Sequence, residues 1–226
     1  MENVEQFWVK TITYNGIEIN FKLVQESFCC RCIERYGTFY EADMLEKLRP
    51  EYKGELNLCL DVGAHIGNHT IFFQKVMGFK MVHSFEPQDD MFHLLVDNIW
   101  LNKCQYNVVS HNFGLCDVPE GKYGISNYVE NSKGRTSFSV SDSGGFHFKR
   151  IDDLGFSDRV DLIKIDVEGM EINVMNGALE TIKRDKPFIW FEEWDEDGVH
   201  EKYKSFLDLG YGLTQCGKQN FFLVPQ

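Results

Sequence analysis

The stretch that decides the fold is Leu58-Cys59-Leu60-Asp61-Val62-Gly63-Ala64-His65-Ile66-Gly67-Asn68-His69-Thr70. An apolar run ends on an acid, two glycines follow four positions apart, and a helix is expected to begin at Asn68. A buried strand that leads through a glycine-rich turn into a helix is typical of a small-ligand site in α/β proteins. The first glycine lets a ligand approach the backbone because it has no Cβ. The helix N-terminus favours an anionic group such as a carboxylate.

The spacing of the glycines separates this stretch from two common nucleotide-binding motifs. A dinucleotide-binding turn needs G-x-G-x-x-G and a phosphate-binding P-loop needs Gly-Lys-Ser/Thr, whereas this chain has G-x-x-x-G after Asp61. Taken alone, the stretch also fits an ordinary strand, turn and helix in a protein core. A function can therefore be assigned only with the help of residues later in the chain.

The composition is that of a soluble globular protein large enough for one α/β domain, with 226 residues, 43% of them hydrophobic and 26% charged. The formal net charge of -12 argues against a nucleic-acid backbone or an anionic membrane surface as a partner, since both need a basic face. No apolar segment reaches transmembrane length. We expect a small-molecule or carbohydrate partner, with no nucleic acid and no membrane.

The cysteines and the first residues indicate the cellular compartment. The acidic run Met1-Glu2-Asn3-Val4-Glu5 has no signal-peptide core. The cysteines are seven, an odd number, and the cluster Cys29, Cys30 and Cys32 has no second cluster or histidine pair at zinc-site spacing. We therefore expect reduced thiols and a cytoplasmic location.

The first 55 residues are expected to form a cap that packs on the main domain of residues 56–226. Residues 11–24 alternate apolar and polar side chains on both sides of Asn15-Gly16, a strong hairpin signal. Residues 39–49 are expected to form a short helix that Pro50 stops.

From residue 56 onward, strands and helices alternate, which predicts a mostly parallel sheet with right-handed crossovers. The last two strands are expected to form an antiparallel C-terminal hairpin. The fold class is therefore α/β, with a seven-stranded sheet and helices on both faces. The predicted strands are about 56–62, 81–85, 106–111, 160–165, 187–191, 211–216 and 220–224.

Five predicted parallel strands end on a polar residue, at the edge where ligands bind in such sheets. These residues are Asp61, Glu86, Asn112, Asp166 and Glu192. The connection of residues 113–155 is long, rich in glycine and without helical periodicity, so it is either a set of hairpins or a lid near the acceptor site, or a solvated surface excursion.

Three segments of the chain resemble the signature motifs of the FkbM-type methyltransferases, and two shorter ones, 39–41 and 112–115, add to the likeness. His65 departs from the pattern, because the family usually has asparagine there. The likeness covers about residues 38–195, and the Lys-Ile-Asp-Val-Glu-Gly run is its most specific part. The three segments are Asp61-Val62-Gly63-Ala64-His65-Ile66-Gly67, Ser84-Phe85-Glu86-Pro87 and Asp161-Leu162-Ile163-Lys164-Ile165-Asp166-Val167-Glu168-Gly169-Met170-Glu171.

The resemblance implies a Rossmann-like methyltransferase fold, S-adenosylmethionine as cofactor and a role for each matching position. Asp61, Gly63 and Gly67 would hold the methionine end, Glu86 the ribose hydroxyls, and Asn112 would lie near the adenine. Asp166 would stand beside the reacting methyl group. The same loops add His65, Asn68 and Pro87 to the cofactor-binding residues expected.

Methyl transfer to a hydroxyl needs a base or a metal ion near the acceptor. Asp166 is the best placed acid, and Lys164, two residues earlier on the same strand face, could orient it or act as a base if desolvated. Strand alternation sends Glu192 and Glu193 to opposite faces, and we choose Glu192 for the site. Asp166 and Glu192 could bind Mg²⁺ through oxygens, or equally hold acceptor hydroxyls without metal.

Three functions are compatible with these residues. The leading one is an O-methyltransferase acting on a hydroxyl of a small molecule or a glycan, with a sugar preferred. A non-catalytic S-adenosylmethionine-binding or scaffold module is the alternative. A nicotinamide-dependent oxidoreductase is disfavoured by the missing third glycine. Glu168 and Glu171 are expected to be acids at a helix start, where the helix dipole favours them.

Overall fold

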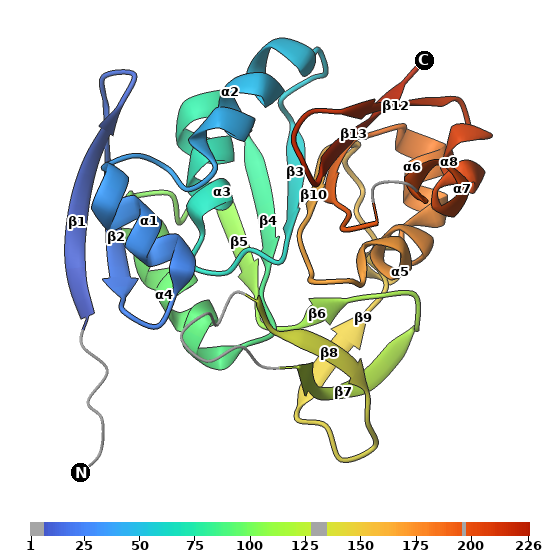
Figure 1. Ribbon diagram of the computed structural model, residues 1–226, viewed down its shortest axis with the longest axis horizontal. Helices are drawn as coiled ribbons and strands as arrows, with labels where there is room; N and C mark the ends of the chain where they lie inside the picture. The colour runs from blue at the N-terminus through green and yellow to red at the C-terminus, as the bar shows by residue number, and fades with distance from the viewer. Residues whose placement is uncertain (1–6, 128–134, 196–197) are drawn as a thin grey trace.

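The computed structural model describes residues 7–127, 135–195 and 198–226, and within them a seven-stranded sheet forms the centre of the protein (Figure 1). Its strands, in chain order, are β3 Leu58–Val62, β4 Met81–Phe85, β5 Val108–His111, β10 Val160–Ile165, β11 Phe188–Glu192, β12 Tyr211–Gln215 and β13 Asn220–Pro225. They lie side by side in the order β12-β13-β11-β10-β3-β4-β5. Strands β5, β4, β3, β10 and β11 pair in parallel, and β13 is antiparallel to both of its neighbours. The predicted α/β fold with an antiparallel C-terminal hairpin is confirmed.

The order of the strands places a crevice between β3 and β10. The chain builds outward from β3 through β4 to β5, and then returns to add β10 on the other side of β3. Connections that leave two neighbouring strands in opposite directions open a space at their carboxyl ends, where α/β proteins bind ligands. Asp61 and Lys164 are paired across these two strands.

Two apolar cores lie on the two faces of the sheet, and the side chains of β3 divide between them by alternation. Cys59 packs against α3, α4 and α2, whereas Leu58, Leu60 and Val62 pack against α5, α6 and the C-terminal helices. The helices are α1 Phe28–Tyr36, α2 Ala42–Glu51, α3 Asn68–Ile71 with a π-helical continuation Phe72–Met77, α4 Asp89–Leu101, α5 Glu171–Asn176, α6 Leu179–Asp185, α7 Val199–Lys202 and α8 Lys204–Leu207. Helices on both faces agree with the prediction. Among the residues described, no helix has both the length and the apolar character that crossing a bilayer requires.

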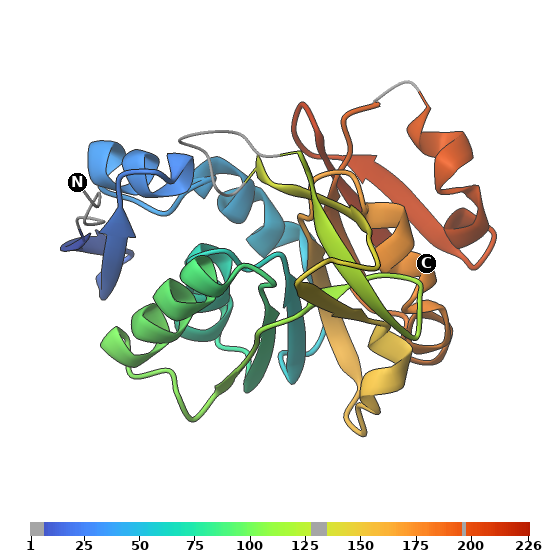
Figure 2. The same cartoon turned by 90° about the horizontal axis from the view of Figure 1, so that it is seen from below.

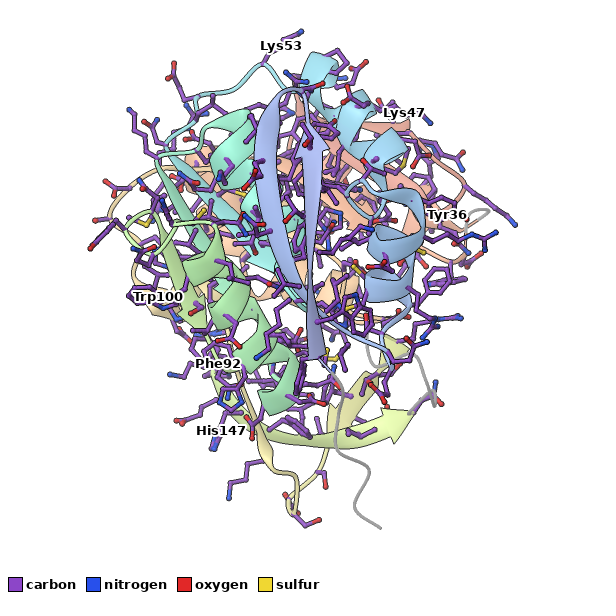
Figure 3. The ribbon with its side chains drawn as sticks, turned by 90° about the vertical axis from the view of Figure 1, so that its left-hand side faces the viewer. Tyr36, Lys47, Lys53, Phe92, Trp100 and His147 are labelled. Carbon is purple, nitrogen blue, oxygen red and sulfur yellow. The ribbon has the colours of Figure 1, made fainter. Side chains whose placement is uncertain are left out.

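The predicted N-terminal hairpin is present as β1 Phe7–Tyr14 and β2 Ile17–Val24 (Figure 3). The outer edge of β2 faces α4, where side-chain amides take the place of a neighbouring strand. The backbone N–H of Lys22 donates to Asn98 Oδ1 at 2.6 Å, and that of Asn20 donates to Asn102 Oδ1 at 3.0 Å. Asn98 and Asn102 are buried, so these bonds satisfy both partners and fix the hairpin on the core.

Two helices near the N-terminus differ from the expectation. The helix expected over 39–49 is α2, which begins later because Glu41 adopts a left-handed φ of 56°. It includes Pro50 rather than stopping before it, since proline in the last turn removes one hydrogen bond and keeps a helical φ. Helix α1 was not predicted, although Ser27 caps it by accepting from the N–H of Cys30 and Gly37 ends it in a left-handed conformation.

The long connection 113–155 forms a second, four-stranded sheet rather than a loose excursion. Its strands are β6 Gly114–Leu115, β7 Glu120–Asn127, β8 Ser137–Val140 and β9 Phe146–Lys149, in the order β6-β9-β7-β8. Residues 128–134 lie outside the described part of the chain. The small sheet lies across the end of the large sheet to which the carboxyl ends of the parallel strands point (Figures 1 and 2). It therefore forms a wall over the crevice between β3 and β10.

Candidate active site

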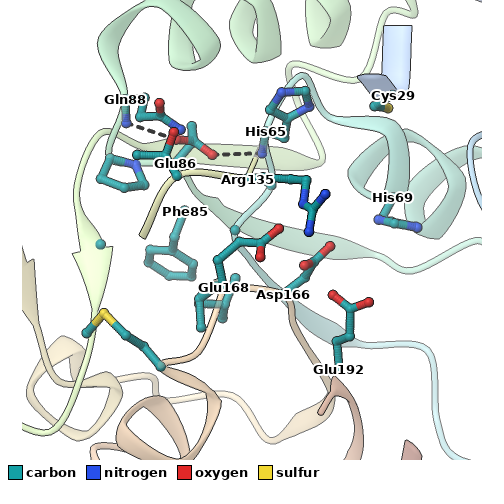
Figure 4. A pocket seen from close by; sticks show the side chains of 18 of the residues that line it. Cys29, His65, His69, Phe85, Glu86, Gln88, Arg135, Asp166, Glu168 and Glu192 are labelled. Carbon is teal, nitrogen blue, oxygen red and sulfur yellow. Dashed lines mark hydrogen bonds between the residues drawn. The ribbon is translucent and has the colours of Figure 1, made fainter. Parts of the chain in front are cut away.

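A cavity of about 510 Å³ lies at the carboxyl ends of β3, β4, β10 and β11. Helix α1 and the residues before α2 border it on one side, and the small sheet borders it on the other through Leu115, Phe138 and Phe148. Its wall includes the acidic and histidine side chains of Glu41 and of six residues labelled in Figure 4: His65, His69, Glu86, Asp166, Glu168 and Glu192. The edge of the sheet predicted to bind a ligand is thus a real concave site.

Glu86 follows β4 and presents a preorganised carboxylate. Its Oε2 accepts the N–H of His65 and its Oε1 accepts the N–H of Gln88, both at 2.9 Å (Figure 4). Burial raises the pKa of Glu86 to about 7, although the two N–H donors favour the ionised form. The side chain of Gln88 also hydrogen-bonds Glu86. A carboxylate has about four acceptor positions, so Glu86 can accept hydroxyl hydrogen bonds in addition to those of the backbone.

Gly63 brings the turn after β3 into direct contact with the end of β10. The N–H groups of Gly63 and Ala64 both donate to the carbonyl of Phe85 at 3.0 Å. Gly63 has a φ of +80°, and a Cβ built on it would lie 1.8 Å from the carbonyl oxygen of Asp166. Only glycine fits here, because the position needs both a left-handed backbone and an empty side chain.

Carboxyl groups converge on one part of the cavity (Figure 4). Asp166 follows β10, Glu192 ends β11, and Glu168 stands in the loop before α5. Burial and the carboxylate of Asp166 raise the pKa of Glu192 to about 8 and that of Glu168 to about 7. The cluster therefore holds more negative charge than its surroundings easily stabilise.

Lys164 is the ammonium group of this cluster. Its Nζ lies 2.9 Å from Asp166 Oδ2, as expected for two residues on the same face of a strand. Burial opposes the charge of Lys164, but Asp166 and then Asp61 outweigh it and raise the pKa of the ammonium above its ordinary value. Burial likewise opposes ionisation of Asp166, yet Lys164 holds the pKa of that carboxyl low. The pair stays charged at neutral pH, which favours orientation of Asp166 over a role of Lys164 as base.

Three predicted cofactor residues do not line the cavity, so their contact with the cofactor stays a prediction. Asp61 is fully enclosed, with Oδ2 accepting the hydroxyl of Thr70 at 2.5 Å. Gly67 caps α3, and a Cβ on it would lie 2.8 Å from Leu95. Asn112 donates its amide to Asp89 at 2.6 Å. A strand-end position brings a residue to the correct edge of the sheet, but neighbouring packing decides which side chains reach the ligand.

The other predicted residues are brought together by the structure. They are Gly63, His65, Asn68, Glu86, Pro87, Asp166 and Glu192. Asn68 also fixes the N-terminal part of the chain to the site, since its amide exchanges two hydrogen bonds with the backbone of Tyr40, at 2.9 and 3.1 Å. Glu193 points away from the cavity and accepts from Tyr203 at 3.0 Å, as the alternation along the strand predicts.

Sequence reasoning missed several groups on the wall. Glu168 was expected at a helix start, but it adopts a φ of 50° two residues after Asp166 and lines the cavity. Glu41 and His69 lie 3.4 Å apart at Oε2 and Nε2. The resemblance of residues 39–41 was a signal for Glu41, whereas nothing in the sequence singled out His69.

Aromatic rings form the outer wall of the cavity. Phe28 and Trp194 are about half exposed, at 50% and 49%, and Phe28 packs edge-on against Tyr40. The guanidinium of Arg135 lies 5.5 Å from the ring of Trp194. Amphipathic rings at a cavity mouth suit ligands with flat apolar faces and polar edges.

Comparisons with known proteins agree with this arrangement. The family profile described as the methyltransferase FkbM domain matches residues 61–219 of the chain. The chain is also similar to the methyltransferase sdnD of Sordaria araneosa, with 24% identity over 191 residues, which span 69% of this chain and 74% of that protein.

Solved structures share the fold at low sequence identity. The methyltransferase FkbM of Methylobacillus flagellatus KT has a TM-score of 0.54 and 18% identity, covering 74% of this chain and 43% of its own. The chain thus spans less than half of that protein. The tRNA m1G37 methyltransferase of M. jannaschii has a TM-score of 0.53 and 11% identity, covering 96% of this chain and 57% of its own. These likenesses show the fold, and the profile match over most of the chain shows that this protein belongs to the methyltransferase FkbM family.

Proposed function

We propose that the protein is an S-adenosylmethionine-dependent O-methyltransferase that acts on a hydroxyl of a neutral small molecule or glycan, with a sugar as the first candidate. One observation carries the proposal: a single cavity holds a hydroxyl-accepting carboxylate, Glu86, and a separate acid pair, Asp166 and Glu192. The first suits a ribose, and the second suits an acceptor hydroxyl.

The residues after β3 and β4 fit the cofactor. The Glu86 carboxylate can accept hydrogen bonds from ribose hydroxyls, and the absence of a side chain at Gly63 keeps the backbone open to close approach. Nε2 of His65 is buried without a hydrogen-bond partner in the described chain. Burial lowers the pKa of His65 to about 4, so its ring is neutral and can meet a polar ligand atom.

S-adenosylmethionine, when bound, would supply a methyl group on a sulfonium, and in-line attack of an acceptor oxygen on that carbon would break the carbon–sulfur bond and release S-adenosylhomocysteine. Asp166, held by Lys164, orients the acceptor hydroxyl by accepting its hydrogen bond. Glu192 stands in the same cluster, and in its ionised form, which prevails above a pH of about 8, it takes the proton that the hydroxyl loses as the new oxygen–carbon bond forms. A positioned base of this kind accelerates a reaction by about 10²–10⁴-fold.

The aromatic rings on the cavity wall favour a carbohydrate or similarly shaped molecule as the acceptor. Phe28 and Trp194 expose part of their rings, which can stack on the apolar face of a sugar. The net charge of -12 disfavours polyanionic acceptors.

The acceptor class is tested by incubating the protein with methyl-labelled S-adenosylmethionine and a panel of free sugars, glycosides and small alcohols. Mass spectrometry then locates the label in the product. We expect an O-methylated member of the panel, formed faster from sugars than from charged acceptors. Label found on nitrogen, carbon or sulfur instead would overturn the O-methyltransferase assignment.

The pKa of Glu86 gives a prediction for the pH dependence of cofactor binding. Protonated Glu86 cannot accept both ribose hydroxyls, so affinity is full above a pH of about 7 and falls as the pH drops through that value. Calorimetry should give a Kd for S-adenosylmethionine about tenfold weaker at pH 6 than at pH 8. Glu86→Gln should flatten the profile. A wild-type profile that is equally flat would remove Glu86 from the ribose site.

A further inference from the structure

We propose that Glu41, His69 and Asp166 form a binding site for a divalent first-row transition-metal ion on the acceptor side of the cavity. One ligand atom from each residue lies within 4.8 Å of the others. The three residues come from separate segments: Glu41 precedes α2, His69 lies in α3, and Asp166 follows β10. The fold thus brings an imidazole and two carboxylates to one point.

The imidazole of His69 gives independent support for a bound cation. His69 is only 6% exposed, and its buried Nε2 has no hydrogen-bond partner in the described residues. That atom lies 3.4 Å from Glu41 Oε2, and the ring points toward the carboxyl groups in Figure 4. Contacts with Phe73 and Trp190 hold the ring in this direction. Buried polar atoms are normally satisfied, so an unmatched nitrogen aimed at carboxylates points to a cation between them.

The side chains around the proposed ligands carry a net negative formal charge. Glu41, Asp166 and Glu192 border a small recess together with Lys164. With all three carboxyl groups ionised, they face one ammonium there, and a divalent ion would balance the remaining formal charge. Lys164 occupies Oδ2 of Asp166 and leaves Oδ1 for another partner.

The ligand set indicates the kind of metal. Ligand atoms about 2.1 Å from a common ion lie at most about 4.2 Å apart, so side-chain shifts of less than about 1 Å would close the site. Mg²⁺ prefers an all-oxygen shell with water, whereas mixed imidazole and carboxylate ligands suit Mn²⁺, Fe²⁺, Co²⁺ or Zn²⁺. The ligand set therefore favours a transition metal at Glu41, His69 and Asp166 over Mg²⁺ at Asp166 and Glu192, which the sequence left open as one of two alternatives.

The catalytic role of this metal site rests on the proposed function, because the ion would act on the acceptor hydroxyl. A bound ion would coordinate the acceptor hydroxyl and lower its pKa, so that the oxygen becomes a better nucleophile. Glu41 lies outside residues 61–219, the part that matches the family profile. The other two proposed ligands, His69 and Asp166, lie within it.

The test uses Mn²⁺ as the probe on the full chain after treatment with a chelator. Electron paramagnetic resonance measures free Mn²⁺ during a titration, and pulsed measurements detect coupling of bound Mn²⁺ to an imidazole nitrogen. The variants are His69→Gln and Glu41→Gln, with Glu168→Gln as a matched control that removes a cavity carboxylate outside the ligand set. Circular dichroism and calorimetry with S-adenosylmethionine show whether each variant is folded and binds the cofactor.

We expect one Mn²⁺ per chain with nitrogen coupling in the wild type. Both ligand variants should bind at least tenfold more weakly, His69→Gln should lose the coupling, and Glu168→Gln should change affinity by less than about threefold. No binding by a wild type that binds S-adenosylmethionine would overturn the metal site alone and leave Glu41 and His69 as an ion pair. Equal binding by all variants, or binding without nitrogen coupling, would show ions on the acidic surface and overturn it as well.

Discussion

Asp166→Asn is expected to lower kcat by about 10²–10³-fold while changing the affinity for S-adenosylmethionine far less. Asparagine keeps the shape of the side chain but lacks the negative charge that orients the acceptor. Steady-state kinetics with the best acceptor, together with calorimetry of the cofactor, separates the two effects. Full turnover with unchanged cofactor affinity would remove Asp166 from the reaction.

The same substitution also leaves the buried ammonium of Lys164 without its partner, which by itself destabilises a protein. The double variant Lys164→Met with Asp166→Asn removes that unpaired charge. If the loss of turnover came from misfolding, the double variant should recover part of it. We expect the free energy of unfolding to recover and kcat to stay low, because the orienting charge is still missing.

Gly63→Ala is expected to cost about 3 kcal/mol or more in the free energy of unfolding. The new Cβ would lie 1.8 Å from the carbonyl oxygen of Asp166, so the turn after β3 and the end of β10 would have to separate. Because those two segments form the floor of the cavity, cofactor binding should be lost as well. Chemical denaturation and calorimetry measure the two effects.

Gly78→Ala is the matched control for this prediction. Gly78 has a similar left-handed φ of +87°, but a Cβ there would meet no atom within 4 Å. Its cost should be that of backbone strain alone, about 1–2 kcal/mol, with cofactor binding retained. Equal costs at the two glycines would mean that the contact between Gly63 and Asp166 is not important for the fold.

Much of the sheet could be predicted because its strands are short apolar runs with clear ends. Strand β4 ends at Phe85 just before Glu86-Pro87, and β10 ends at Ile165 just before Asp166, as expected. Helix α1 was not predicted, although the sequence carries its signals: Ser27 before it, Cys30 and Ile33 three residues apart on its buried face, and Gly37 after it. The division into a cap of residues 1–55 and a main domain stays a prediction, as does the cytoplasmic location.

The site was predictable only in part, because strand ends fix an edge and not the direction of each side chain. Glu86, Asp166 and Glu192 reach the cavity, but Asp61 is enclosed by the packing of α3 and Asn112 turns to Asp89. Glu41 could not be placed from local sequence. Its position depends on a left-handed backbone and on the hydrogen bonds between Tyr40 and Asn68, which lie 28 residues apart.

The measurement that tests the account most directly is a calorimetric titration of S-adenosylmethionine into wild type, Glu86→Ala and Asp97→Ala at pH 8. Asp97 is a partly exposed acid on α4 and serves as the control. We predict that the wild type and Asp97→Ala bind alike, and that Glu86→Ala binds at least tenfold more weakly, on the order of 1.4 kcal/mol. A wild type that does not bind S-adenosylmethionine, or a Glu86→Ala variant that binds as tightly as the wild type, would contradict the cofactor site described here.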